Sequence, residues 1–180
     1  RRQRQMCIRD RYKVIEYFGD DVRRINHFLK VYGYVKMIGE CENLDDSMQE
    51  ILEVTAVLHD VGIKVAEQKY NSSAGHYQQL EGPPVAKKIL DELGYPDDFV
   101  ERVMYLIAHH HTYTNIDGMD YQILVEADFL VNADEDRLSS DAIENFKEKI
   151  FKTTTGIAVL ENNYLLSLIH ISEPTRLLSI

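Results

Sequence analysis

The hydrophobic positions of the chain recur every three or four residues along most of its length. In one clear stretch, apolar or small side chains stand at Met48, Ile51, Leu52, Thr55 and Leu58. This spacing places them on one face of an α-helix, which is expected to pack against the core. Comparable stripes run through residues 20–39, 85–93, 97–107, 121–131 and 140–151, and no strand-like alternation is visible. The pattern predicts an all-α protein, a single compact helical bundle with about six main helices.

Turn-forming residues mark the ends of these predicted helices. Gly39 and Gly94 follow apolar stripes and are typical helix stops. The segment 67–82 is rich in Ser, Asn and Gln and is predicted to be a long loop. Glu81 is followed by Gly-Pro-Pro, which predicts a helix start there, because proline is tolerated in the first turn of a helix.

Several of the inward-facing stripes continue onto polar residues. The stripe of 48–58 leads to His59, with Asp60 beside it, and His27, His110 and Asp128 fall on the inward faces of three other predicted helices. Burying such a group without a partner costs several kcal/mol, on the order of 2–7. Each histidine taken alone is explained by a hydrogen bond to a carbonyl. Four helices that each supply one such group are better explained by a metal site in the core of a bundle.

Three further residues are weaker candidates. Glu81, at the predicted helix start, suits either the helix dipole or a metal, and these two readings stay equally open. His76, in the predicted loop, is expected to be solvated or to contact a substrate. Within the triple histidine 109–111, His110 continues the stripe of Val103 and Ile107 best.

Composition and charge narrow the function classes. The 180 residues carry a net charge of −10, and without the Arg-rich segment 1–11 the charge is −14. An acidic domain is a poor general binder of nucleic acid, because such binding depends on Lys and Arg. Two cysteines, no signal peptide and no membrane-length apolar run predict a cytoplasmic protein that does not bind membranes. The oligomeric state is left open.

The two ends of the chain differ from the rest. MCIRDR near the start and SLIHISEPTR near the end resemble translated sequencing-adapter read-through. Residues 1–11 and 167–180 are therefore predicted to be non-native, with a native domain over 12–164. The alternative reading of the Arg-rich start is a nucleic-acid-binding arm.

The ordered set His27…His59-Asp60…Asp128 resembles the signature of the HD-domain superfamily of metal-dependent phosphohydrolases over about residues 20–135. The resemblance implies that these four residues hold the main metal. It also implies a second ion, with Asp60 as a bridge, His110 as a ligand and Glu81 where a histidine usually stands. His109 fits the same pattern as His110. The usual HDxGK lysine is displaced by one position to Lys64.

The resemblance implies hydrolysis of a phosphoester or phosphoanhydride by metal-activated water. Asp60 and Lys64 are the expected catalytic residues, and Lys64, His76 and His109 are expected to contact the substrate. That substrate is expected to be a small phosphorylated molecule, such as a nucleotide, with one or two divalent ions (Mn, Fe, Co, Ni, Zn or Mg) as cofactor. The alternatives are a non-catalytic ligand-binding or interaction module and a di-iron oxygenase.

Overall fold

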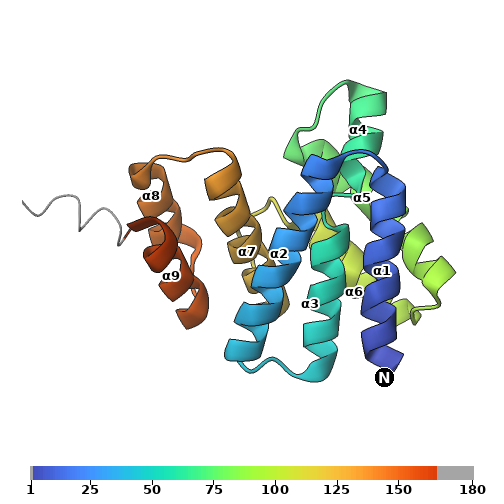
Figure 1. The fold of residues 1–180 in the computed structure, drawn as a ribbon, viewed down its shortest axis with the longest axis horizontal. Helices are drawn as coiled ribbons and strands as arrows, with labels where there is room; N and C mark the ends of the chain where they lie inside the picture. The colour runs from blue at the N-terminus through green and yellow to red at the C-terminus, as the bar shows by residue number, and fades with distance from the viewer. Residues whose placement is uncertain (1, 166–180) are drawn as a thin grey trace, which may run out of the picture.

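The computed structural model describes residues 2–165, with side chains described from residue 8 onward, and over that range it is helical without strands (Figure 1). The all-α prediction is confirmed. The elements are α1 (Arg2–Phe18), α2 (Val22–Cys41), α3 (Asp46–Leu58), α4 (Gly62–Tyr70), α5 (Gly75–Leu93), α6 (Asp97–His109), α7 (Met119–Glu135), α8 (Ser140–Ile150), α9 (Thr154–Leu160) and a π-helical turn, η1 (Glu161–Leu165).

Helix α3 lies at the centre of the bundle and contributes to two halves of the core. On one side, Leu52 and Ala56 pack with the buried faces of α2 and α7. On the other, Val54 and Leu58 pack with α1, α5 and α6. Six of the seven residues Leu52–Leu58 are apolar or small, which suits a helix covered on several sides.

The helix count exceeds the prediction of about six because short or polar helices were not recognised. Helices α4 and α9 span 9 and 7 residues, too short for a clear stripe. Residues 2–11 belong to α1, whereas 167–180 lie outside the described residues. The domain bounds 12–164 stay a prediction. Within residues 2–165, no helix is both long and apolar enough to span a membrane.

The predicted long loop over 67–82 is wrong. Helix α4 continues to Tyr70 and α5 begins at Gly75, so the connection is only four residues long. Pro83 and Pro84 lie inside α5 rather than in its first turn. The turns of α5 before them are held by packing: a Cβ on Gly82 would lie 2.6 Å from Cγ2 of Ile107. Tertiary contact here outweighs the two backbone hydrogen bonds that proline removes.

The His59-Asp60 pair lies in a tight turn between two helices. α3 ends at Leu58 and α4 starts at Gly62. The amide of Val61 donates to the carbonyl of Leu58, and that of Ile63 to the carbonyl of Asp60. A Cβ on Gly62 would come within 2.6 Å of backbone atoms of Gln78 and Gly82. Glycine therefore lets α4 start directly against α5 and lets the turn point its side chains inward.

Candidate metal centre

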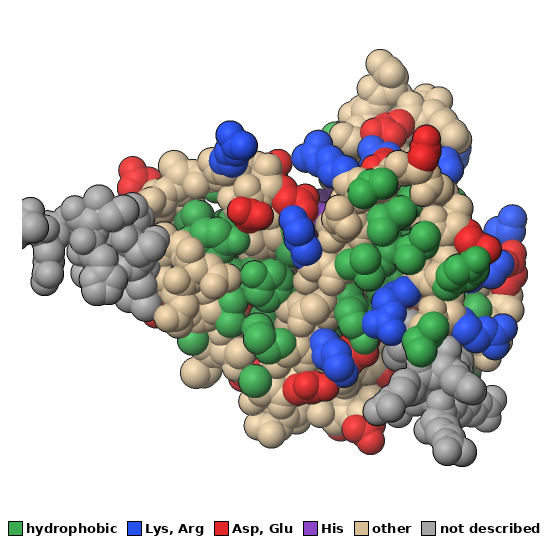
Figure 2. Space-filling view, in the orientation of Figure 1, with side chains coloured by type: hydrophobic (Ala, Val, Ile, Leu, Met, Phe, Trp, Pro, Cys, Tyr) green, Lys and Arg blue, Asp and Glu red, His purple; other side chains and the backbone are tan. Residues whose placement is uncertain are grey.

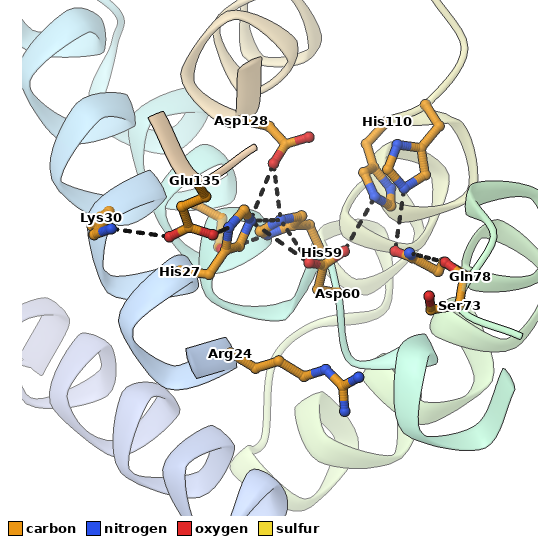
Figure 3. A network of polar contacts seen from close by, with 12 residues as sticks. Arg24, His27, Lys30, His59, Asp60, Ser73, Gln78, His110, Asp128 and Glu135 are labelled. Atoms are coloured by element: carbon orange, nitrogen blue, oxygen red, sulfur yellow. Dashed lines mark hydrogen bonds and ion pairs between the residues drawn. The ribbon is translucent and has the colours of Figure 1, made fainter. Parts of the chain in front are cut away.

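Four side chains from α2, the α3–α4 turn and α7 converge on one point (Figure 3). Nε2 of His27 lies 3.3 Å from Nε2 of His59 and 3.2 Å from Oδ1 of Asp128. Oδ2 of Asp60 lies 3.6 Å from the His27 nitrogen and 3.5 Å from the His59 nitrogen, which is itself 3.5 Å from Asp128. His59 is fully buried, and His27 and Asp128 are 7% and 5% exposed.

Hydrogen bonds on the far side of each ring orient the two imidazoles. Nδ1 of His59 lies 2.8 Å from the carbonyl of Ala56, and Nδ1 of His27 lies 3.1 Å from Oε2 of Glu135. Because both partners only accept, each Nδ1 carries the proton of the neutral ring. The two Nε2 lone pairs then face one another and two carboxylates. Such an arrangement needs positive charge between the ligand atoms, either protons or a cation.

The pKa shifts in the cluster likewise favour positive charge between the two carboxylates. Burial opposes charge on His59, but Asp60 and Asp128 outweigh it and raise the pKa of His59 to about 9. Burial also opposes charge on His27, and its pKa is raised chiefly by Asp128. Burial favours the neutral carboxyls, yet the histidines hold the pKa of Asp60 and of Asp128 below the usual range. Both carboxylates are thus ionised at neutral pH.

The spacing of the ligand atoms fits a bound metal ion. Ligands about 2.0–2.2 Å from a tetrahedral ion lie about 3.3–3.6 Å from one another. The five distances above span 3.2–3.6 Å. Nitrogen and carboxylate oxygen together form a donor set for first-row divalent ions.

A second group adjoins the first through Asp60. The group consists of Asp60, His110 and His111, whose ligand atoms lie within 4.8 Å of one another. Nδ1 of His110 donates to the carbonyl of Ile107 at 2.8 Å, so its Nε2 holds a lone pair 3.6 Å from Oδ1 of Asp60. That buried Nε2 has no hydrogen-bond partner among the described residues. Asp60 thus turns one oxygen to each group, as a bridging carboxylate would.

Comparison with known proteins agrees with this geometry. The sequence matches the family model described as HD domain over residues 24–145. The chain belongs to the HD-domain family. A solved structure of a predicted HD superfamily hydrolase from an uncultured Thermotogales bacterium shares 22% identity and a TM-score of 0.63, over 93% of this chain and 88% of that one. At that identity the likeness shows the HD-domain fold. No curated protein matches the chain.

The HD-domain structure does not bring Glu81 to the cluster. Its carboxylate accepts from Nζ of Lys69 at 2.7 Å and from the hydroxyl of Tyr70 at 2.8 Å, and these contacts lower the pKa of Glu81. The expectation was made for a helix start at Glu81, whereas Glu81 lies in the second turn of α5 and points to the end of α4. The place beside Asp60 and His110 is taken by His111.

Lys64 also lies away from the site. Its Nζ donates to the backbone carbonyl of Tyr17 at 2.9 Å and lies 5.2 Å from the centre of the Tyr17 ring. Lys64 follows Asp60 by four residues, so a contact between the two would require one continuous helix, but the chain turns between α3 and α4. The two other expected substrate contacts lie elsewhere too. His76 is exposed and its ring contacts that of Tyr77, and His109 donates to the carbonyl of Tyr105 at 2.7 Å.

Glu135 is a residue of the site that was not predicted. It accepts from Lys30 at 3.0 Å as well as from His27, and so it fixes the orientation of the His27 ring. A signal for it was present in the sequence. Glu135 follows Val131 by four positions, so it continues the stripe on which Asp128 lies.

Gln78 and His111 were also not predicted as parts of the site. Gln78 offers Oε1 to Nε2 of His111 at 3.2 Å, which leaves Nδ1 of His111 without the proton. Burial and the neighbouring His110 lower the pKa of His111 to about 4, so this ring is neutral at pH 7. Gln78 carried no signal, because it falls in the segment that was expected to be a loop.

A cavity of about 380 Å³ opens directly onto the two groups. Its wall includes His27, Asp60, His111 and Asp128. Figure 2 shows a histidine side chain at the bottom of a hollow, with acidic side chains on one side and basic side chains on another. A small molecule can therefore reach the buried ligand atoms from solvent.

Proposed function

We propose that this HD domain is a metal-dependent phosphohydrolase that cleaves a small phosphate ester. The observation that carries the proposal is the buried Nε2 of His110, which has no hydrogen-bond partner in the described part of the chain and faces the carboxylate that the second group shares with the first. A buried polar atom without a partner costs about 1–3 kcal/mol, so a ligand on that atom is the simplest explanation. His27, His59, Asp60 and Asp128 would hold one divalent ion, and Asp60, His110 and His111 a second.

The protein's own residues suit this chemistry. A divalent ion in such a site would supply hydroxide near neutral pH and neutralise charge on phosphoryl oxygens. Asp60 places one carboxylate oxygen toward each group, so it is the residue best placed to orient an attacking water between them. The carbonyls of Ala56 and Ile107 keep His59 and His110 in the tautomer that leaves Nε2 free.

Metal content and turnover together test the proposal. Protein loaded with Mn²⁺ or Co²⁺ should release phosphate from a small aliphatic ester such as glycerol phosphate, and Asp60→Ala should lose both bound metal and turnover. Asp91→Ala, which changes an exposed aspartate on α5, is the matched control. Full activity in Asp60→Ala would show that the site is wrongly assigned. Bound metal without turnover of any phosphate ester would favour the non-catalytic alternative.

The number of ions is tested by two further variants. His111→Ala should reduce the bound metal from two ions per chain to one, because His111 belongs only to the second group. Glu81→Gln should leave the content unchanged, since Lys69 and Tyr70 hold this side chain. A loss of one ion in Glu81→Gln but not in His111→Ala would show that Glu81, and not His111, is the ligand of the second ion.

A further inference from the structure

The cavity above the two groups is walled almost entirely by polar side chains. Of the thirteen described residues that line it, Ile63 is the only one with a hydrocarbon side chain, and none is Phe, Tyr, Trp, Leu or Met. The two imidazoles on the wall, His27 and His111, belong to the metal-ligating groups. Sites that hold a flat aromatic ligand offer apolar or aromatic surface to its faces. Apart from Ile63 and these two imidazoles, the described wall offers a nucleobase no hydrocarbon or aromatic side chain.

The charged side chains of the wall include two arginines next to an acidic residue, Asp21. Arg23 and Arg24 are the basic residues among the described lining residues, and both stand in the first turn of α2. Arg24 is held between Asp21 at 2.8 Å and Glu67 at 2.5 Å. Arg23 is exposed, and no ion pair engages it among the side chains described, those of residues 8–165. A guanidinium left free in this way can bind the oxygens of a phosphate.

Another part of the wall is formed by the last two turns of α7 and by Asp136, the residue that follows this helix. Asn132 and Asp136 follow Asp128 by four and eight residues, so the three share one helix face and all line the cavity. Asn132 offers both a donor and an acceptor, and Asp136 offers acceptors. The carboxylates of Glu135 and Asp136 repel an anion. Hydroxyl groups, which donate and accept, suit this side.

We infer that the cavity binds the phosphate ester of a small polyhydroxylated alcohol, such as a pentose or hexose phosphate, and rejects a nucleobase. The phosphate lies toward Arg23 and the ligating groups, and the hydroxyls lie against Asn132 and Asp136. The cavity volume of about 380 Å³ is near the lower end of the roughly 300–1,000 Å³ of small-molecule sites. The hydrolysis of this ligand rests on the proposed function, whereas its binding does not.

Ribose 5-phosphate and adenosine 5′-monophosphate form a matched pair, because they share the ribose and the phosphate and differ in the base. Two measurements apply to Mn²⁺-loaded protein: phosphate release, and the rise in melting temperature with added compound, which reports binding without turnover. Ribose 5-phosphate should be preferred about tenfold or more in both.

Each outcome of this comparison decides one of the two proposals. Equal or better binding of the adenosine compound overturns the inference, as does the absence of binding by either compound. Preferential binding of ribose 5-phosphate without turnover of any phosphate ester supports the inference and refutes the proposed phosphohydrolase function. Preference in both measurements supports both.

Two variants locate the ends of the ligand. Asn132→Leu should weaken ribose 5-phosphate roughly tenfold and leave inorganic phosphate unchanged, with Asn162→Leu on η1 as control. Arg23→Gln should weaken the binding of ribose 5-phosphate and of inorganic phosphate by a similar factor, with the exposed Lys88→Gln as control. If Asn132→Leu weakens the binding of ribose 5-phosphate and of inorganic phosphate equally, or of neither, the assignment of the hydroxyls to α7 is wrong.

Discussion

Glu135 is the residue on which the orientation of His27 depends. One carboxylate oxygen accepts from Nδ1 of His27 at 3.1 Å, and the other accepts from Nζ of Lys30 at 3.0 Å. Burial would raise the pKa of Glu135, but Lys30 and His27 lower it, so the group is ionised at neutral pH. The substitution Glu135→Gln keeps the size of the side chain and removes its charge. It also places an amide NH₂ toward one of the two donors, Nδ1 of His27 or Nζ of Lys30.

The expected effect is a loss of metal affinity with little loss of structure. Replacing the hydrogen-bond partner of a ligating histidine typically weakens metal binding by roughly 10–100-fold, or about 1.4–2.7 kcal/mol. The lower part of that range applies if Gln turns its carbonyl oxygen to His27 and its NH₂ toward Lys30. The upper part applies if Lys30 keeps the carbonyl oxygen, because His27 Nδ1 then faces a donor.

Competition for Co²⁺ against a chromophoric chelator measures this affinity directly. The control is Glu40→Gln, which removes the charge of an exposed glutamate on α2 that also pairs with a lysine, Lys36, at 2.8 Å. Circular dichroism and melting of the metal-free proteins test whether the fold is retained. Wild-type Co²⁺ affinity in Glu135→Gln, together with lost affinity in His27→Ala, would refute a positioning role for Glu135.

Two predictions concern stability. Burial raises the pKa of Asp10 to about 6, although the hydroxyl of Tyr95 donates a hydrogen bond to its carboxylate. The carboxyl therefore binds a proton more tightly in the folded than in the unfolded protein, and the folded protein loses stability as the pH rises through 6. Asp10→Asn should raise stability at pH 8 by about 1–3 kcal/mol, with a difference from wild type that shrinks toward pH 4; a pH-independent difference in urea unfolding would contradict this. Gly62→Ala should cost about 1–3 kcal/mol, because its Cβ meets backbone of α5, whereas Gly33→Ala, in open space on α2, should not lower the melting temperature. Equal melting temperatures for the two variants would show that α4 shifts freely.

The burial of the central site residues was predictable from the sequence. His27, His59, His110 and Asp128 each continue an apolar stripe, and all four are buried. A helical stripe fixes which way a side chain faces to within about one position. That was enough to recognise an inward polar residue on four separate helices. The all-α fold was predicted from the same hydrophobic spacing, and the HD-domain family from the resemblance of His27…His59-Asp60…Asp128 to its signature.

The errors arose where local pattern and tertiary packing disagree. The stripe of 48–58 leads through His59 without a break in spacing, which predicts one helix, and only the contact between Gly62 and α5 shows why the chain turns there. That error misplaced Lys64. Glu81 was misplaced because Pro83 and Pro84 were expected in the first turn of a helix, whereas they lie inside α5. His111 was ranked below His110 because the helical spacing was assumed to continue past His109, whereas α6 ends at that residue.

The two histidines that are fully buried among the described residues use the ends of their own helices in the same way. His59 and His110 each follow the last residue of a helix, and each Nδ1 donates to the carbonyl three positions earlier. The last turn of a helix leaves carbonyls without a partner, and a buried helix end must find donors for them. A neutral imidazole supplies one donor and keeps its other nitrogen for a metal. His27 lies inside α2, where its helix has no free carbonyl, so it depends on Glu135 from α7. Substituting His59 or His110 should therefore cost both metal and helix stability, whereas Glu135→Gln separates the two.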